Sequence, residues 1–210
     1  MTQPSSPHCS PQSPTPASPE DDAHLRERTL SKQEILKGHF LHAFRDQVAL
    51  PNGQTTVREY VVHPGAVMIM AQTADGRWVM ERQYRYPMQQ VMIEFPAGKL
   101  DAGEDQLLCA QRELLEETGY QAREWAYAGV LHPVISYSTE FIGIWFARDL
   151  QLGARQLDDG EFLDVFTATE DELLQWARDG QITDAKTLTG LLWLQNHRSG
   201  QWPLTWQRAG

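Results

Sequence analysis

Residues 98–120, which read GKLDAGEDQLLCAQRELLEETGY, constrain this chain more than any other segment. Side chains three and four positions apart share one face of a helix, so Glu113, Glu116 and Glu117 would converge on one side. Three carboxylates in one place repel one another unless a positive charge lies among them. Carboxylate oxygens are the ligands that hard cations such as Mg²⁺ and Mn²⁺ prefer. The segment therefore predicts a helix with one metal-binding face.

The same segment resembles the Nudix box, the signature of the Nudix hydrolases. The chain fills every position of that signature, with Gly98, Glu104, Arg112, Glu113, Leu114, Glu116, Glu117, Gly119 and Tyr120. Seven of these positions require one residue type each, so a chance match anywhere in the chain has odds of roughly one in a million. An ordinary solvated acidic helix face is the alternative, but it leaves the spacing and the flanking glycines unexplained.

The resemblance implies a role for each residue of the box. Metal ions, Mg²⁺ with Mn²⁺ as the alternative, would be held by Glu113, Glu116, Glu117 and the main-chain carbonyl of Ala97. Glu116 is in addition a candidate catalytic residue. The structural residues would be Gly98, Glu104, Arg112 and Gly119, with a Glu104–Arg112 pair that fixes the loop before the helix.

Composition narrows the class of protein. The chain has 210 residues and a formal net charge of −10, without a block of Lys or Arg. A polymeric nucleic acid is therefore not an expected partner, because phosphate backbones need clustered cations. Cys9 and Cys109 form neither a disulfide framework nor a zinc motif, which favours a reducing cytoplasm. Neither a signal peptide nor a membrane-spanning apolar segment is expected.

The chain divides into four expected parts. Residues 1–22 are rich in Pro and Ser and are expected to be a disordered tail. Residues 23–62 alternate as strands around the turn Pro51-Asn52-Gly53, and the resemblance implies that they form a dimerisation element of a homodimer. Residues 63–198 would be the Nudix hydrolase domain, and residues 199–210 a C-terminal tail.

Within the expected hydrolase domain, strands and helices mix without regular alternation. We expect strands at 65–71, 78–84, 92–95, 125–130, 140–147 and 162–168, helices at 106–118, 171–179 and 185–197, and a loop at Pro96-Ala97-Gly98. Asp105 and Asp184 are expected N-caps, and Gly119 would end the first helix. The pattern indicates an α+β fold. The resemblance implies the Nudix α/β/α sandwich, with an N-terminal antiparallel β extension.

Two flanking motifs are similar to the ADP-ribose pyrophosphatase branch of the family. Gln83-Tyr84-Arg85 precedes Glu94-Phe95-Pro96-Ala97-Gly98, as that branch has an aromatic-Arg strand end before the box. Arg85 would hold a diphosphate through its planar donor fork, and a surface ion pair is the alternative. Strand alternation places Arg85 on the face of Gln83 and Glu81. Arg58 is a further candidate for substrate binding.

Two later loops complete the expected site. Residues 132–140 resemble the branch's substrate loop, with Glu140 in the place of its glutamate, although Ile135 stands where that branch has a proline. Residues 157–162 resemble the acidic loop that supplies the general base. Asp159 and Glu161 are the candidates there, with Glu161 also a candidate metal ligand, and an ordinary acidic turn is the alternative.

These features predict an enzyme that cleaves a small nucleoside diphosphate derivative. The first hypothesis is Mg²⁺-dependent hydrolysis of ADP-ribose to AMP and ribose 5-phosphate. The changed residues before Glu140 leave open another nucleotide sugar, a dinucleotide or an oxidised nucleotide. A non-catalytic nucleotide-sensing module is the third hypothesis, and the complete set of glutamates in the box argues against it.

Overall fold

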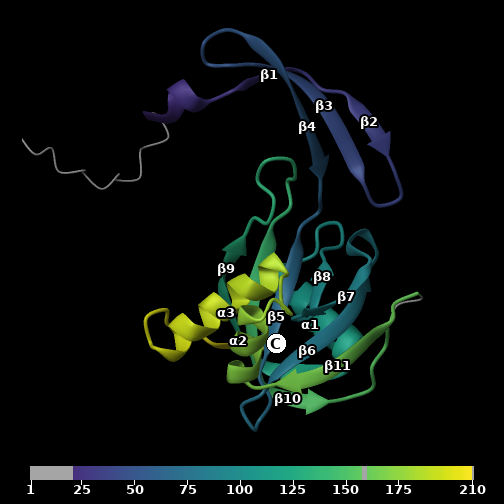
Figure 1. The fold of residues 1–210 in the computed structure, drawn as a ribbon, viewed down its shortest axis with the longest axis vertical. Helices are drawn as coiled ribbons and strands as arrows, with labels where there is room; N and C mark the ends of the chain where they lie inside the picture. Colours follow the sequence, from purple (N-terminus) through teal and green to yellow (C-terminus); the bar gives the residue numbers. More distant parts are fainter. Residues whose placement is uncertain (1–20, 158–159, 210) are drawn as a thin grey trace, which may run out of the picture. The chain divides into compact units, whose positions relative to one another are not determined.

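The computed structural model describes residues 21–157 and 160–209, and it separates into two compact units. The boundary falls between Glu59 and Tyr60, three residues before the boundary expected from the sequence. None of the helices in these described ranges is both long and apolar enough to cross a membrane. Figure 1 shows the course of the chain.

The N-terminal unit is a small antiparallel arrangement of strands. It begins with the 3-10 helix η1 (Asp21–Leu25), two residues inside the expected tail, whose other residues lie outside the described ranges. Strand β3 (His42–Ala49) lies between β1 (Arg28–Ser31) and β2 (Glu34–Lys37), and β4 (Thr55–Val62) pairs with β3. The expected turn closes the β3–β4 hairpin, where the amide of Gly53 donates to the carbonyl of Leu50. β1 and β2 lie within residues 23–62, where strands were expected, although the sequence pattern predicted no separate bounds for these two.

The second unit contains two sheets. The larger sheet has the order β12-β9-β10-β5-β8, with only its β10–β5 pair parallel. The smaller sheet has the order β11-β6-β7. The strands are β5 (Ala66–Ala71), β6 (Trp78–Arg85), β7 (Gln90–Glu94), β8 (Ala97–Lys99), β9 (Tyr120–Leu131), β10 (Ile142–Leu152), β11 (Leu163–Ala168) and β12 (Gln207–Arg208). The 3-10 helix η2 (Tyr86–Met88) joins β6 to β7.

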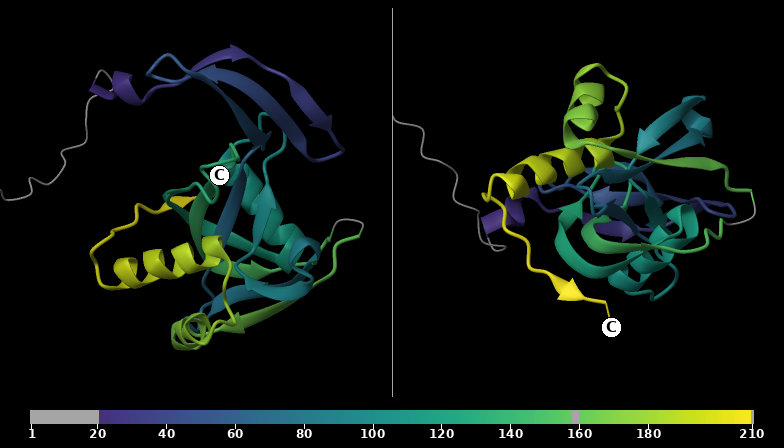
Figure 2. Two further views of the ribbon diagram at one scale, coloured as in Figure 1. Left: turned by 45° about the horizontal axis from the view of Figure 1, so that its top comes forward. Right: turned by 90° about the horizontal axis from the view of Figure 1, so that it is seen from below.

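Strand β5 divides the core of this unit into two layers. Its alternate side chains are buried in two separate apolar clusters, one with Met68 and Met70 and the other with Val67 and Ile69. The first cluster includes side chains of α2 (Glu170–Arg178) and α3 (Ala185–Arg198), and the second includes side chains of α1 (Gln106–Thr118). Helix α1 therefore lies on the opposite face of the sheet from α3, as Figure 2 shows. This is the expected α/β/α sandwich.

Helix α1 has the bounds that its sequence predicts. The side chain of Asp105 accepts hydrogen bonds from the amides of Leu107 and Leu108, which caps the first turn. Gly119 ends the helix in the left-handed conformation, with φ of 77°, which costs glycine little. Ala110 and Leu114 are fully buried against the sheet. The opposite side of the helix is thereby held at a fixed position, which the glutamates of the box occupy.

The prediction of a loop at Pro96-Ala97-Gly98 was wrong. Ala97 and Gly98 belong to β8, which pairs antiparallel with β5 through Met68↔Ala97 and Val67↔Gly98. Proline and glycine within three residues indicate a turn locally, but the partner strand lies about 30 positions earlier, so local patterns do not show it. The expected C-terminal tail likewise contains β12, which pairs with β9. Strand β10 begins at Ile142, two residues later than expected.

Candidate active site

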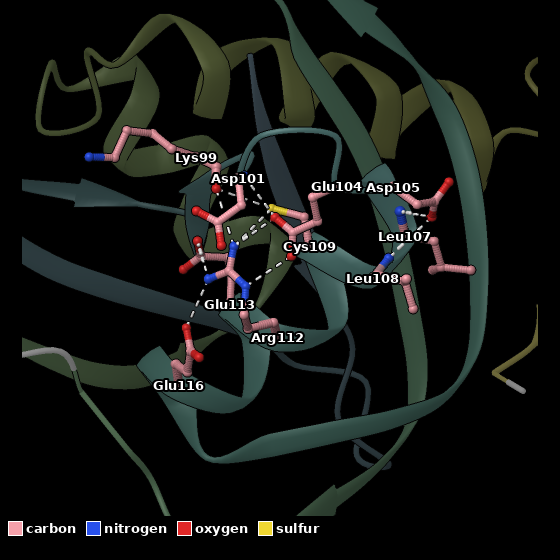
Figure 3. A network of polar contacts seen from close by, with 10 residues as sticks. All are labelled: Lys99, Asp101, Glu104, Asp105, Leu107, Leu108, Cys109, Arg112, Glu113 and Glu116. Carbon is pink, nitrogen blue, oxygen red and sulfur yellow. Dashed lines mark hydrogen bonds and ion pairs between the residues drawn. The ribbon is translucent and has the colours of Figure 1, made fainter. Parts of the chain in front are cut away.

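Arg112 is the centre of the hydrogen-bond network on α1 (Figure 3). Its Nε and Nη2 atoms donate to the two oxygens of Glu104, each at 3.0 Å, which is the pair expected from the box. Its Nη1 donates to Glu113 at 2.8 Å and to Glu116 at 3.0 Å. Glu104 also accepts from the amide of Asp101 at 2.9 Å. Arg112 therefore ties the loop before α1 to two carboxylates of the helix and stabilises both.

Strand β8 lies in direct contact with this carboxylate face. A Cβ atom at Gly98 would stand 1.8 Å from Cδ of Glu113, a distance that only glycine avoids. The amide of Ala97 donates to Oε2 of Glu117 at 3.1 Å. The glycine before the box thus lets the strand approach the helix, and the strand in turn orients Glu117.

Two carboxylates of α1, those of Glu113 and Glu117, lie in an environment that disfavours their charge. Burial raises the pKa of Glu113 to about 7, and its neighbours Glu116 and Glu161 add to that rise. Burial also raises the pKa of Glu117, with further contributions from Glu81 and Glu113. Arg112 acts in the other direction on the loop, where its hydrogen bond lowers the pKa of Glu104 to about 2. A cation placed among the buried carboxylates would relieve this repulsion.

The acidic loop is described in part. Glu161 lies close enough to influence Glu113 and Glu117 electrostatically, so this loop reaches the carboxylate face of α1. Asp159, the other candidate base, lies outside the described residues. Contacts in the structure bring together Glu113, Glu116, Glu117 and Ala97, and Glu161 acts electrostatically on two of these carboxylates. The metal and base roles of these residues and of Asp159 stay predictions.

A second ionic network lies on β6 and β7. Arg85 donates two hydrogen bonds to Glu94, at 2.7 and 2.9 Å. Lys186 of α3 also donates to Glu94, and to Asp184 at 3.0 Å. Arg85 thus forms an ion pair, which was the alternative to diphosphate binding. The pair is not a surface one, however, because the side chain of Glu94 is only 3% exposed. Sequence reasoning missed Lys186, whose partner lies 92 positions away.

Glu81 is a buried carboxylate that the sequence analysis placed on the Arg85 face without assigning it a role. It is fully buried, and among the residues that the structure describes neither of its oxygens has a hydrogen-bond partner. Burial and the neighbouring Glu94 raise its pKa. The sequence did carry a signal for this position, because Glu81 continues the buried apolar run Trp78-Val79-Met80 of a strand. A charged residue at the end of such a run is expected to have a special partner.

Glu140 lies in the loop before β10. Its side chain approaches His63, with 3.8 Å between Oε1 and Nε2. Nδ1 of His63 accepts from the amide of Gly65 at 3.0 Å, which leaves the proton on Nε2, toward Glu140. The end of the loop is fixed by backbone hydrogen bonds between Val61 and residues 137 and 139. His63 had not been expected to approach this loop.

Arg58 belongs to the N-terminal unit. Its guanidinium donates to both oxygens of Glu27, at 3.0 Å from Nε and 2.5 Å from Nη2. A substrate role for Arg58 remains a prediction. Asp184 caps α3 by accepting from the amide of Thr187 at 3.0 Å, which agrees with the structural role expected for it.

The carboxylates of this site are suitable ligands for a divalent cation, although their oxygens do not converge on one point as in an assembled metal site. In the part of the chain that the structure describes, no three His, Cys, Asp or Glu side chains form a ready metal-binding group. Glu113 and Glu116 are bonded to Arg112 instead, and Glu117 to the amide of Ala97. The buried oxygens of Glu81 have no hydrogen-bond partner in the described ranges, and the neighbouring carboxylates repel one another. The chemistry of these donors therefore fits a hard cation.

This fold and this carboxylate helix define a Nudix hydrolase. The family model for the NUDIX domain matches residues 62–190, and the model for the nucleoside diphosphate sugar hydrolase N-terminal domain matches residues 27–61. The chain belongs to the Nudix family, with the N-terminal domain of nucleoside diphosphate sugar hydrolases.

Similar proteins cover most of the chain. The methanol dehydrogenase activator of Bacillus methanolicus is 40% identical over 175 residues, which are 81% of this chain and 94% of that protein. The ADP-ribose pyrophosphatase of Bacillus subtilis (strain 168) is 35% identical over 173 residues, with the same shares covered. The crystal structure of an ADP compounds hydrolase has the same fold, with a TM-score of 0.76 at 23% identity over 84% of this chain and 97% of that one.

Proposed function

We propose that this protein hydrolyses the diphosphate bond of ADP-ribose, with Mg²⁺, to AMP and ribose 5-phosphate in the cytoplasm. The observation that carries the proposal is the carboxylate face of α1, with Glu113 and Glu116 held by Arg112 and the buried Glu117 held by the amide of Ala97. The similarity to the ADP-ribose pyrophosphatase of Bacillus subtilis supports ADP-ribose as the substrate. Hydrolysis forms a bond from water oxygen to one phosphorus and breaks the bridging P–O bond.

The residues divide into those that hold the cation and those that hold the substrate. Glu113, Glu116, Glu117, Glu161 and the carbonyl of Ala97 would bind the cation, after Glu113 and Glu116 turn from Arg112. A bound divalent cation neutralises charge on the diphosphate and makes water a better nucleophile near neutral pH. Arg85 would bind the diphosphate through its planar fork, and Glu140 would contact the rest of the substrate.

A substrate panel with Mg²⁺ and product identification tests this proposal. ADP-ribose is expected to give the highest kcat/KM, ahead of other nucleotide sugars, dinucleotides and oxidised nucleotides. A higher value for one of those classes would replace ADP-ribose as the preferred substrate while leaving diphosphate hydrolysis in place. If every substrate in the panel remains intact, the chain would instead be a non-catalytic nucleotide-sensing module.

The acidic loop supplies the general base, and we assign Asp159 to this role and Glu161 to cation binding. Glu161 already influences Glu113 and Glu117, as a shared ligand would. We expect Asp159→Asn to lower kcat by about a hundredfold with little change in KM, because proton removal counts only in the transition state. Glu161→Gln should be partly rescued by raising Mg²⁺, because mass action offsets weakened affinity. Initial rates against substrate and Mg²⁺ concentration separate the two roles.

The reverse pattern, with Mg²⁺ rescue of Asp159→Asn alone, would exchange the two assignments. Near-parental kcat in both variants would place the base elsewhere, with Glu116 or Glu140 as the next candidates.

We also propose that the protein is a homodimer that uses its N-terminal unit. Large apolar side chains of that unit are exposed in the single chain: Leu30, Ile35, Leu36, Phe40, Leu41 and Val57. Such exposed groups are typical of an interaction surface. Light scattering should give twice the chain mass of 23.9 kDa, and Leu36→Glu should lower that value toward one chain. A single-chain mass at tens of micromolar wild-type protein would contradict the dimer.

A further inference from the structure

Glu81 is a buried carboxylate to which the proposed function assigns no role. It lies on β6 at 0% exposure, and within residues 21–157 and 160–209 both of its carboxylate oxygens lack a hydrogen-bond partner. An unpaired buried carboxylate costs a fold several kcal/mol, so such groups normally have a partner. An ion pair would offset the cost of burying Glu81 only if a cationic side chain contacted its oxygens.

The nearby cationic side chains are already used by Glu94. Glu94 lies directly across from Glu81 in the β6–β7 register, so the two carboxylates share one face of the sheet. Arg85 donates two hydrogen bonds to Glu94, and Lys186 donates another. Within residues 21–157 and 160–209, neither Lys186 nor Arg85 donates a hydrogen bond to Glu81. The side chains of Arg85 and Lys186 thus influence Glu81 electrostatically, but their hydrogen bonds go to Glu94.

The element packed on the other side brings a further carboxylate. Glu117 of α1 is 4% exposed, accepts from the amide of Ala97, and interacts electrostatically with Glu81. The oxygens of Glu81 and Glu117 thus belong to two neighbouring carboxylates, one from a strand and one from the box helix. A proton or a metal ion between two such groups relieves the repulsion that the more distant charges of Arg85 and Lys186 offset only in part.

We propose that Glu81 is an additional ligand, supplied by β6, for the divalent cation that Glu117 binds. This inference rests on the cation site of the proposed function, and it adds a ligand that lies outside the box. A carboxylate with both oxygens free of protein partners, buried beside another carboxylate, has the coordination capacity that a hard cation uses. Glu81 would then fix the cation on the sheet side while the box glutamates hold it on the helix side.

Titration with Mn²⁺ alone, without nucleotide, tests the assignment on the full-length protein. Glu81→Gln keeps the shape of the side chain and removes its charge, while Glu81→Met fills the same space with an apolar group. Arg82→Gln, on the exposed side of the same strand, is the matched control. Calorimetry or electron paramagnetic resonance gives Mn²⁺ affinity and stoichiometry, and melting curves in EDTA report folding.

Both Glu81 variants should bind Mn²⁺ at least about tenfold more weakly than the parent, whereas Arg82→Gln should bind it as the parent does. Glu81→Met should also melt at a higher temperature than the parent in EDTA, because it removes a buried unpaired carboxylate. On addition of Mn²⁺, the melting temperature of Glu81→Met should rise less than that of the parent, because a cation that binds more weakly stabilises the folded state less.

Folded variants with the parental Mn²⁺ isotherm would overturn the inference and leave Glu81 as a protonated partner of Glu117. The experiment is independent of the substrate. If the Glu81 variants lose Mn²⁺ affinity but the parent does not cleave ADP-ribose, Glu81 remains a cation ligand and the proposed activity is rejected. If the parent cleaves ADP-ribose but the Glu81 variants bind Mn²⁺ as the parent does, the activity stands and the ligand role of Glu81 is rejected.

Discussion

Glu117→Gln should lower kcat/KM for ADP-ribose by about a thousandfold at saturating Mg²⁺ while the fold survives. The substitution keeps the acceptor for the Ala97 amide but removes a negative ligand from the buried face of α1. A thousandfold loss corresponds to about 4 kcal/mol of transition-state stabilisation, which is the usual scale for one essential electrostatic contact. Steady-state kinetics and circular dichroism on the same preparations check both halves of this expectation.

The melting temperature provides an internal check on Glu117→Gln. Because the glutamate is crowded by Glu81 and Glu113, the neutral variant should melt at a temperature no lower than the parent in EDTA. Glu124→Gln is the control, since Glu124 of β9 accepts a hydrogen bond from Arg148 of β10, and its activity should stay within about twofold. Activity of Glu117→Gln within about threefold of the parent would rule out the ligand role.

Gly98→Ala should lower the free energy of unfolding by at least about 2 kcal/mol and reduce activity at least about a hundredfold. The added methyl group would lie 1.8 Å from Cδ and 2.0 Å from Oε1 of Glu113, so β8 or the side chain must move. Forced overpacking of this kind costs about 1–3 kcal/mol, and a displaced catalytic side chain adds a loss in rate. Urea unfolding and steady-state kinetics measure the two effects.

A double-mutant cycle tests the stated cause of the Gly98→Ala loss. Glu113→Ala removes the colliding atoms, so Gly98→Ala added to Glu113→Ala should cost much less stability than Gly98→Ala in the parent. Simple additivity of the two stability changes would show that the conformation of β8, rather than contact with Glu113, requires glycine at this position.

Local chemistry explains which parts of the fold were predictable. The bounds of α1 follow from an Asp cap and a terminal glycine, which act through neighbouring residues alone. Strand β8 was missed because its three residues gain strand structure only by pairing with β5. The bounds of β1 and β2 within the expected strand region could not be predicted, since their residues are all exposed and have no buried alternation.

The candidate site was predictable to the extent that it lies in one helix. The spacing of the box placed Glu113, Glu116 and Glu117 together, and the Glu104–Arg112 pair is within reach along the same segment. The bonds from Arg112 to Glu113 and Glu116 depend on side-chain choices that spacing does not specify. Glu81 and Lys186 become part of the site only through packing between distant elements, so the sequence gives their positions on a strand and a helix but not their neighbours.

The most direct measurement is the identity of the products that wild-type protein and Glu117→Gln form from ADP-ribose with saturating Mg²⁺. The account predicts equal amounts of AMP and ribose 5-phosphate from the wild type, and at most about a thousandth of that rate from the variant. Intact ADP-ribose after prolonged incubation with folded, Mg²⁺-loaded wild-type protein would contradict the proposed activity. Equal product formation by both proteins would contradict the site.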